Sequence, residues 1–121
     1  AKRMDHWLGV VIGACEQSGR AVLPTLLAPK PITSWLTEDN SDFKLVLRAQ
    51  GTRLSSLAAE VIKPPTSVSI LIGPEGGLDE TELTLAENAS FLATGFGPRI
   101  LRTETAPIVA LSLLQEKWGD F

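Results

Sequence analysis

The 121-residue sequence contains a single cysteine, Cys15, and a single histidine, His6. An internal disulfide needs two cysteines, and a Cys/His metal cluster needs several of these residues, so we expect neither and no bound metal. Cys15 falls on the apolar side of a helical pattern, which favours a small buried thiol over a reactive one. His6 lies near the start of the chain, where we expect an exposed side chain rather than a catalytic one.

Long hydrophobic runs and an excess of positive charge are also missing. The longest apolar stretches, such as 68–72 and 108–114, are much shorter than the roughly 20 residues that cross a bilayer. No apolar signal segment opens the chain, so we expect a cytosolic protein without a membrane span. The net charge is −3, whereas nucleic-acid affinity comes largely from clustered Lys and Arg. Any RNA contact must therefore be local, and Arg99 and Arg102 form a small positive spot.

Hydrophobic residues make up 44% of the chain, which suits one globular domain with a real core. The strand signal at 68–72 is nearly all apolar and predicts burial on both faces. Continuous apolar strands separated by helices are typical of a parallel sheet that is covered on both sides, so the class is α/β. Prolines confine the segment 22–27 to a short or edge strand. The full pattern predicts helices at 4–17 (ended by Gly19), 32–36, about 54–61, 80–89 and 106–117, and strands at 22–27, 43–47, 68–72 and 91–94.

The helix expected from Glu80 carries the clearest local signature. Asp79 can cap this helix, and Glu82 can return the hydrogen bond to the backbone of Asp79, which is a capping box. Leu78 can pack on Leu83 as a hydrophobic staple. The last helix is expected to gather its apolar residues on one face, which consists of Ile108, Leu111, Leu114 and Trp118.

Two glycine-bearing loops follow the carboxyl ends of strands. The first is Gly73–Gly77, between the strand at 68–72 and the capped helix. In an open α/β sheet ligands bind at such positions, because strand ends and helix amino termini offer free backbone groups. An ordinary strand-to-helix turn, with glycines only for their positive φ, is the alternative.

The second loop is Gly95–Ala106, in which Ile100 and Leu101 stand between two arginines. This pattern indicates an apolar wall with exposed backbone groups that suits a flat heterocycle. The alternative is a helix entry with Thr103 or Thr105 as the cap and a buried Ile-Leu pair. Neither loop is a P-loop or a G-x-G-x-x-G fingerprint, so ATP hydrolysis and dinucleotide binding are disfavoured.

Together the loops resemble a known family. The stretches Leu71–Leu78 with Glu82, Gly97–Ala106 and Trp118–Asp120 closely resemble the carboxyl-terminal motifs of RsmE-type RNA methyltransferases. Ala14–Arg20, with Pro24 after it, resembles the motif upstream. The resemblance covers nearly the whole chain, and the two loop motifs together are specific.

The resemblance implies a SPOUT-type parallel sheet with a carboxyl-terminal deep trefoil knot, which holds S-adenosylmethionine in a bent form. It also implies a homodimer. In family members a PUA-like RNA-binding domain precedes the methyltransferase domain, so residues 1–121 are expected to be a partial SPOUT domain without it. The cofactor loops map onto 47–51, 72–77 and 95–101, and the expected cofactor-binding residues are Leu47, Ile72, Gly73, Pro74, Glu75, Gly76, Phe96, Gly97, Ile100, Leu101 and Thr105.

The implied activity is methylation of N3 of a uridine in small-subunit ribosomal RNA. Removing the imide proton and stabilising the resulting anion are the protein's tasks. We assign catalysis to Arg102 and Glu104, with Glu75 as the second candidate carboxylate, and RNA contact to Arg99 and Arg102. Glu104 can equally serve only to stabilise the start of the last helix. A SPOUT methyltransferase acting on tRNA, and a non-catalytic RNA-associated dimerisation module, are the alternative functions.

Overall fold

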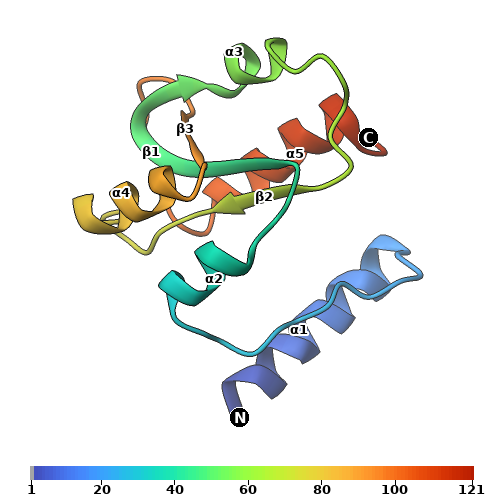
Figure 1. The fold of residues 1–121 in the computed structure, drawn as a ribbon. Coiled ribbons are helices and arrows are strands. Elements are labelled where there is room, and N and C mark those ends of the chain that lie inside the picture. The colour runs from blue at the N-terminus through green and yellow to red at the C-terminus, as the bar shows by residue number, and fades with distance from the viewer. Residues whose placement is uncertain (1) are drawn as a thin grey trace. The chain divides into compact units, whose positions relative to one another are not determined.

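The structure is a computed structural model that describes residues 2–121. It divides the chain into two compact units, one before Ile32 and one from Ile32 to Phe121. In chain order (Figure 1) the elements are α1 (Lys2–Ser18), α2 (Ile32–Glu38), β1 (Phe43–Arg53), α3 (Leu54–Ala59), β2 (Val68–Leu71), α4 (Glu80–Asn88), β3 (Leu92–Gly95) and α5 (Ala106–Trp118).

The first unit consists of α1 and the extended segment that follows it. Gly19 ends α1 as expected, because its φ of 75° is the left-handed conformation that lets the Arg20 amide donate back to the Cys15 carbonyl at 2.9 Å. Cys15 is buried and His6 is exposed, as the sequence indicated. No described helix is long and apolar enough to cross a membrane.

The predicted strand at 22–27 is wrong. This segment is irregular, and Val22 and Leu27 are 73% and 68% exposed. A strand needs a partner for its backbone hydrogen bonds, and none of the described strands pairs with this segment. Proline also removes an N–H donor, so apolar β-prone residues alone do not make a strand here.

The second unit is built on a parallel three-stranded sheet with the order β2-β1-β3, which confirms the α/β class. In β1, Leu45 and Val46 are fully buried because a strand flanks it on each side. β2 is the strand that was expected to be buried on both faces, but all four of its residues are only half-buried. Its position at the edge of the sheet explains the difference.

Helices cover both faces of the sheet. On one face, Val46 packs with Leu83 and Ala86 of α4 and with Leu36 of α2. On the other face, Leu45 packs with Leu54 of α3 and Leu114 of α5. Side chains alternate along a strand, so neighbouring residues of β1 supply both hydrophobic cores.

β1 is longer than predicted and bends strongly at its carboxyl end (Figure 1). Its register on β3 shifts there, so that Thr94 pairs with both Leu47 and Thr52. The bend brings two backbones together: a Cβ on Gly51 would lie 2.6 Å from the carbonyl carbon of Thr94, and a Cβ on Gly95 would lie 2.9 Å from the Gly51 nitrogen. Only glycine fits at either position.

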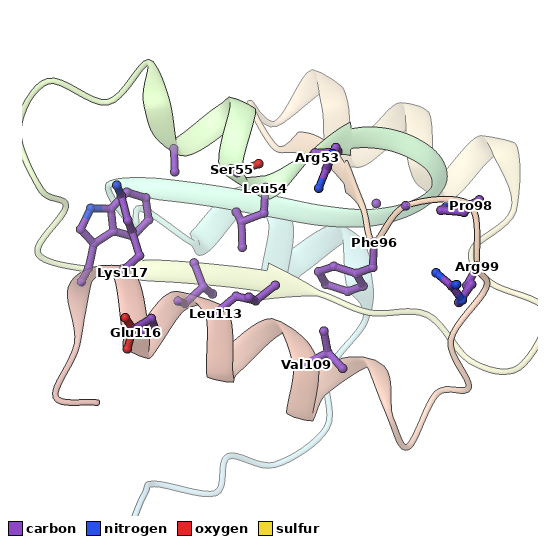
Figure 2. Close-up of a pocket in the computed structure, with 15 residues that line it drawn as sticks. Arg53, Leu54, Ser55, Phe96, Pro98, Arg99, Val109, Leu113, Glu116 and Lys117 are labelled. Carbon is purple, nitrogen blue, oxygen red and sulfur yellow. The ribbon is translucent and has the colours of Figure 1, made fainter.

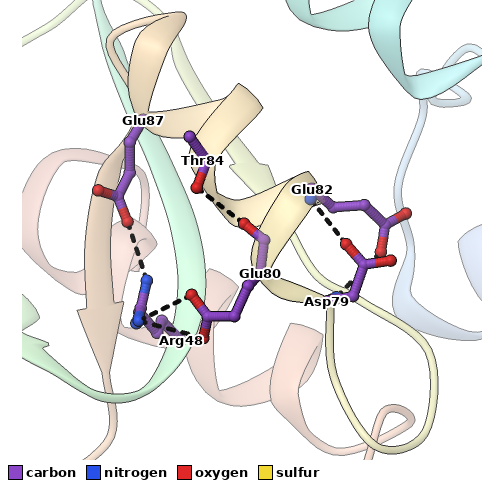
Figure 3. Close-up of polar contacts among 6 residues, drawn as sticks. All are labelled: Arg48, Asp79, Glu80, Glu82, Thr84 and Glu87. Carbon is purple, nitrogen blue, oxygen red and sulfur yellow. Dashed lines mark hydrogen bonds and ion pairs between the residues drawn. The ribbon is translucent and has the colours of Figure 1, made fainter.

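The capping box of α4 is confirmed (Figure 3). The Glu82 amide donates to Asp79 Oδ1 at 2.7 Å, and the Asp79 amide donates to Glu82 Oε1 at 3.0 Å. Leu78 packs against the core cluster that contains Leu83, as a hydrophobic staple requires.

The apolar face predicted for α5 is only partly right. Leu114 is buried, but Ile108 and Leu111 are 67% and 53% exposed. The buried positions of this helix are Ala106, Ala110 and Leu114, because small residues let α5 approach the sheet closely. Ile108 and Leu111 therefore lie on the outer side of the helix, whereas Trp118 packs against the same core cluster as Leu114, as predicted.

Candidate functional site

Parallel strands place their carboxyl ends at one edge of the sheet, and there the bent carboxyl-terminal half of β1 meets the segments that follow β2 and β3. They surround a cavity of about 650 Å³, which we call the strand-end cavity. The residues expected at the site that line it are Leu47, Ile72, Gly73, Pro74, Glu75, Gly76, Phe96, Gly97, Arg99, Ile100, Leu101 and Arg102. The two glycine-bearing loops, which are far apart in sequence, are thus walls of one cavity.

A direct contact joins these two loops. The Thr103 hydroxyl donates to the Gly73 carbonyl oxygen at 3.4 Å. Gly73 itself is confined, because a Cβ there would lie 2.7 Å from the Leu78 nitrogen. The turn after β2 is therefore folded tightly against its own helix start and also held against the second loop.

The alternative explanation of the second loop, a capped helix entry with a buried Ile-Leu pair, does not match the structure. Ile100 is 85% exposed and Leu101 is half-buried. Thr105 occupies the cap position of α5 but makes no side-chain cap hydrogen bond, and Thr103 contacts Gly73 instead. An exposed isoleucine beside a cavity is the arrangement that a planar apolar ligand would cover.

Three glycines leave open space on the cavity wall. Gly76, Gly77 and Gly97 have φ values of 85°, 81° and 77°, and a Cβ on any of them would meet no atom within 4 Å. Of the three, Gly76 and Gly97 were expected to bind a cofactor. The positive φ explains why glycine occurs there, and the empty surroundings leave room for a ligand beside the backbone, although the Gly77 N–H itself donates to the Pro74 carbonyl oxygen at 2.8 Å.

Charged side chains from β1 and from both loops line the strand-end cavity. Arg48 is held by α4, with Nη1 3.1 Å from Glu87 Oε1 and Nη2 3.4 Å from Glu80 Oε1 (Figure 3). Arg102 Nη1 lies 3.9 Å from Glu104 Oε1, and both side chains are largely exposed. Glu104 and Thr105 do not line the cavity, whereas Glu75 does. Of the two carboxylates considered from the sequence, Glu75 is thus the one on the cavity wall.

Three residues that line the strand-end cavity were not named individually as site residues from the sequence: Arg48, Gln50 and Thr103. Gln50 has a φ of 62°, a conformation that costs a non-glycine residue about 1 kcal/mol or more. Nothing in the sequence marks this strain, because it arises from the bend of β1. The Thr103 contact depends on the folding of two distant loops and has no local signal either.

A second cavity, of about 820 Å³, lies between α3, the end of β1 and α5 (Figure 2), and we call it the side cavity. Gly95, Phe96, Gly97 and Arg99 line both cavities. The chain segment after β3 therefore separates two hollows. Among residues 2–121, no group of three or more His, Cys, Asp or Glu side chains is placed to hold a metal ion.

A parallel α/β sheet with a loop-lined cavity at its strand ends is the arrangement of many enzymes that bind nucleotide-like ligands. Residues 1–115 match the model of the RNA methyltransferase domain, so the chain belongs to this family. Relatives with a similar sequence include two ribosomal RNA small subunit methyltransferases E. The one from Buchnera aphidicola is 33% identical over 100% of the chain, and the one from Bacillus subtilis is 34% identical over 93% of it. The expected resemblance to RsmE-type methyltransferases is thereby confirmed.

Solved structures agree with these relatives. A Legionella pneumophila protein in complex with the cofactor SAM matches 99% of the chain with a TM-score of 0.89 and 41% identity. The ribosomal RNA small subunit methyltransferase E of Neisseria gonorrhoeae, bound to S-adenosyl methionine, also matches 99% with a TM-score of 0.89 and 38% identity. The chain spans about half the length of these proteins, between 46% and 50%.

Proposed function

We propose that the chain is the cofactor-binding part of an S-adenosylmethionine-dependent methyltransferase that methylates N3 of a uridine in small-subunit ribosomal RNA. The observation that carries this proposal is the convergence of the bent half of β1 and the segments after β2 and β3 on one cavity. The names of the relatives support the substrate, and the cofactor seen in two similar structures supports the ligand.

The strand-end cavity fits the cofactor in size and in character. Its volume of about 650 Å³ falls within the roughly 300–1,000 Å³ that is usual for small-molecule sites. Leu47, Ile100 and Leu101 would hold the adenine between apolar side chains. The backbone of Gly73–Gly76, which has open space at Gly76, would receive the ribose and the methionine part. Thr105 lies outside the lining, so we assign it no cofactor contact. The bound cofactor supplies an electrophilic methyl group on a positively charged sulfur.

The residues of this chain would position the RNA and stabilise charge. Arg102 is suited to pair with a uridine carbonyl oxygen, on which negative charge grows as N3 loses its proton. Arg99 would contact the RNA backbone. Glu75, which lines the cavity, would accept the proton from N3, and Glu104 would act through Arg102 by keeping its guanidinium in place. In this scheme Glu104 is a positioning residue.

We further propose that the chain after β3 is threaded through the bend of β1, as a trefoil knot requires. The close approach of Gly51 and Gly95, and the double pairing of Thr94, support this path. A homodimer in the cytoplasm is also proposed. The exposed apolar side chains of Ile108 and Leu111 on α5 suit a second copy, which would remove them from water.

Calorimetric titration with S-adenosylmethionine tests the cofactor assignment, because a bare scaffold would give no binding heat. Transfer of labelled methyl to small-subunit particles, followed by mass spectrometry of nucleosides, tests the substrate. Methylated uridine in that RNA is expected; modification of tRNA alone would favour the alternative substrate. In full-length protein, Arg102→Ala should lower kcat at least tenfold and leave cofactor affinity nearly unchanged, in line with loss of a charge-stabilising contact. Wild-type methyl transfer by this variant would remove Arg102 from the mechanism.

A further inference from the structure

The side cavity has walls of two kinds. Its floor is apolar, with Leu54 from α3, Val109 and Leu113 from α5, and Phe96 from the segment after β3 (Figure 2). Leu113 is 44% exposed, so a large part of an apolar side chain faces the cavity or solvent. A surface of this type favours a flat, partly apolar group over water.

The rim of the side cavity is positively charged. Arg53, Arg99 and Lys117 line it, with Glu116 as the one acidic residue among its lining. None of these three cations has a side-chain ion pair or hydrogen bond to any residue in the described range 2–121, in contrast to Arg48 and Arg102. The cavity thus gathers unpaired positive charge on a chain whose net charge is −3, which indicates an anionic occupant.

The position of the side cavity further limits which class of molecule can bind there. The segment from Gly95 to Gly97, together with Arg99, forms a common wall with the strand-end cavity. A molecule in the side cavity therefore lies next to the ligand of the strand-end cavity. Proteins that bind single-stranded RNA combine apolar or aromatic platforms for unstacked bases with cations for the phosphates, which are the two features present here.

We propose that the side cavity binds an unstacked nucleotide of the RNA strand that carries the methyl acceptor. Its base would lie on Phe96 and Leu113, and the adjoining phosphates would pair with Arg53 and Lys117. This inference rests on the proposed methyltransferase function and deepens it by locating the substrate strand on the α3 and α5 side of the loop after β3.

The first test measures RNA binding by fluorescence anisotropy, with the full-length protein and a short single-stranded RNA that contains a uridine. Arg53→Gln and Lys117→Gln should each weaken binding. Each should also reduce the slope of log Kd against the logarithm of the salt concentration by about 0.7, the value for one lost phosphate contact on a single strand. Lys63→Gln is the matched control, since Lys63 is exposed and lines neither cavity; it should keep the parent slope.

The second test places a charge on the apolar floor. Leu113→Glu should raise the RNA Kd about tenfold, because the base loses its apolar platform and the new carboxylate repels the phosphates, while calorimetry shows unchanged affinity for S-adenosylmethionine. Its melting temperature should stay near that of the parent because Leu113 is half exposed. RNA affinity and salt slope equal to the parent in all three side-cavity variants would overturn the inference. So would conversion of a dimer to monomers by Leu113→Glu in sedimentation, because the side cavity would then be an interface between copies. Failure of the parent protein to bind S-adenosylmethionine would instead overturn the proposed function.

Discussion

The contact between Gly51 and β3 yields the sharpest prediction about stability. In Gly51→Ala the new methyl group would lie 2.6 Å from the Thr94 carbonyl carbon, 2.9 Å from its oxygen and 3.0 Å from the Gly95 nitrogen. All three neighbours are backbone atoms of a buried strand end, so no side chain can rotate away. Overpacking in cores costs about 1–3 kcal/mol, and we expect Gly51→Ala to reach about 3 kcal/mol, the upper end of that range.

Urea unfolding followed by tryptophan fluorescence measures this change, since Trp35 and Trp118 both pack on the cores of the second unit. The melting temperature should fall by roughly 15 °C for a unit of this size. Gly13→Ala is the control, because a Cβ at Gly13 meets nothing within 4 Å and alanine favours a helix by about 0.5–1 kcal/mol. If Gly51→Ala were as stable as the parent, the close approach of the bend to β3 would not exist in solution.

Three further changes test local features. Ser90 has a φ of 72° after α4, so Ser90→Gly should raise the free energy of unfolding by about 0.5–1 kcal/mol in urea titration. Asp79→Ala removes the cap of α4 and should lower the free energy of unfolding by about 1 kcal/mol. Asp79→Asn should retain most of the stability, because asparagine can also cap a helix; equal losses in both variants would argue against the cap. Hydrogen bonds from the Thr66 hydroxyl and amide lower the pKa of Asp42. A lowered carboxyl pKa stabilises the fold above about pH 4 and this contribution is lost as the pH falls through the folded-state pKa. Asp42→Asn should therefore be less stable than the parent near neutral pH and equal to it in strong acid, as thermal melts at several pH values can show.

Local chemistry made several elements of both units predictable from the sequence. The capping box at Asp79 and Glu82, the apolar run of β1 and the glycine that ends α1 are each determined by neighbouring residues, and the structure has all three. The strand at 22–27 failed because strand formation depends on a distant partner for its hydrogen bonds. The prediction that Ile108 and Leu111 lie on the buried face of α5 failed for a related reason. Which face of a helix is buried depends on how the helix packs on the sheet, and not on the helix sequence alone.

The candidate site likewise combines residues that the sequence marks with residues whose positions depend on the fold. The loops Gly73–Gly77 and Gly95–Ala106 stood out because their composition is unusual for simple connections, and residues of both line the strand-end cavity. Gln50 and Thr103 did not stand out. Their places depend on the bend of β1 and on a contact between loops 30 residues apart, which no local pattern encodes. The side cavity was likewise missed, because Arg53, Arg99 and Lys117 come together only through the fold.

The common wall formed by Gly95–Gly97 has a thermodynamic consequence for turnover. If one ligand shifts this short segment, the affinity of the neighbouring ligand changes, and equilibrium linkage requires the reverse effect to have the same size. Measuring cofactor affinity with and without RNA would therefore give the same coupling factor as the opposite experiment. In the proposed reaction the sulfur would lose its positive charge, so the products would leave with a different mutual coupling from the one with which the cofactor and the RNA arrived.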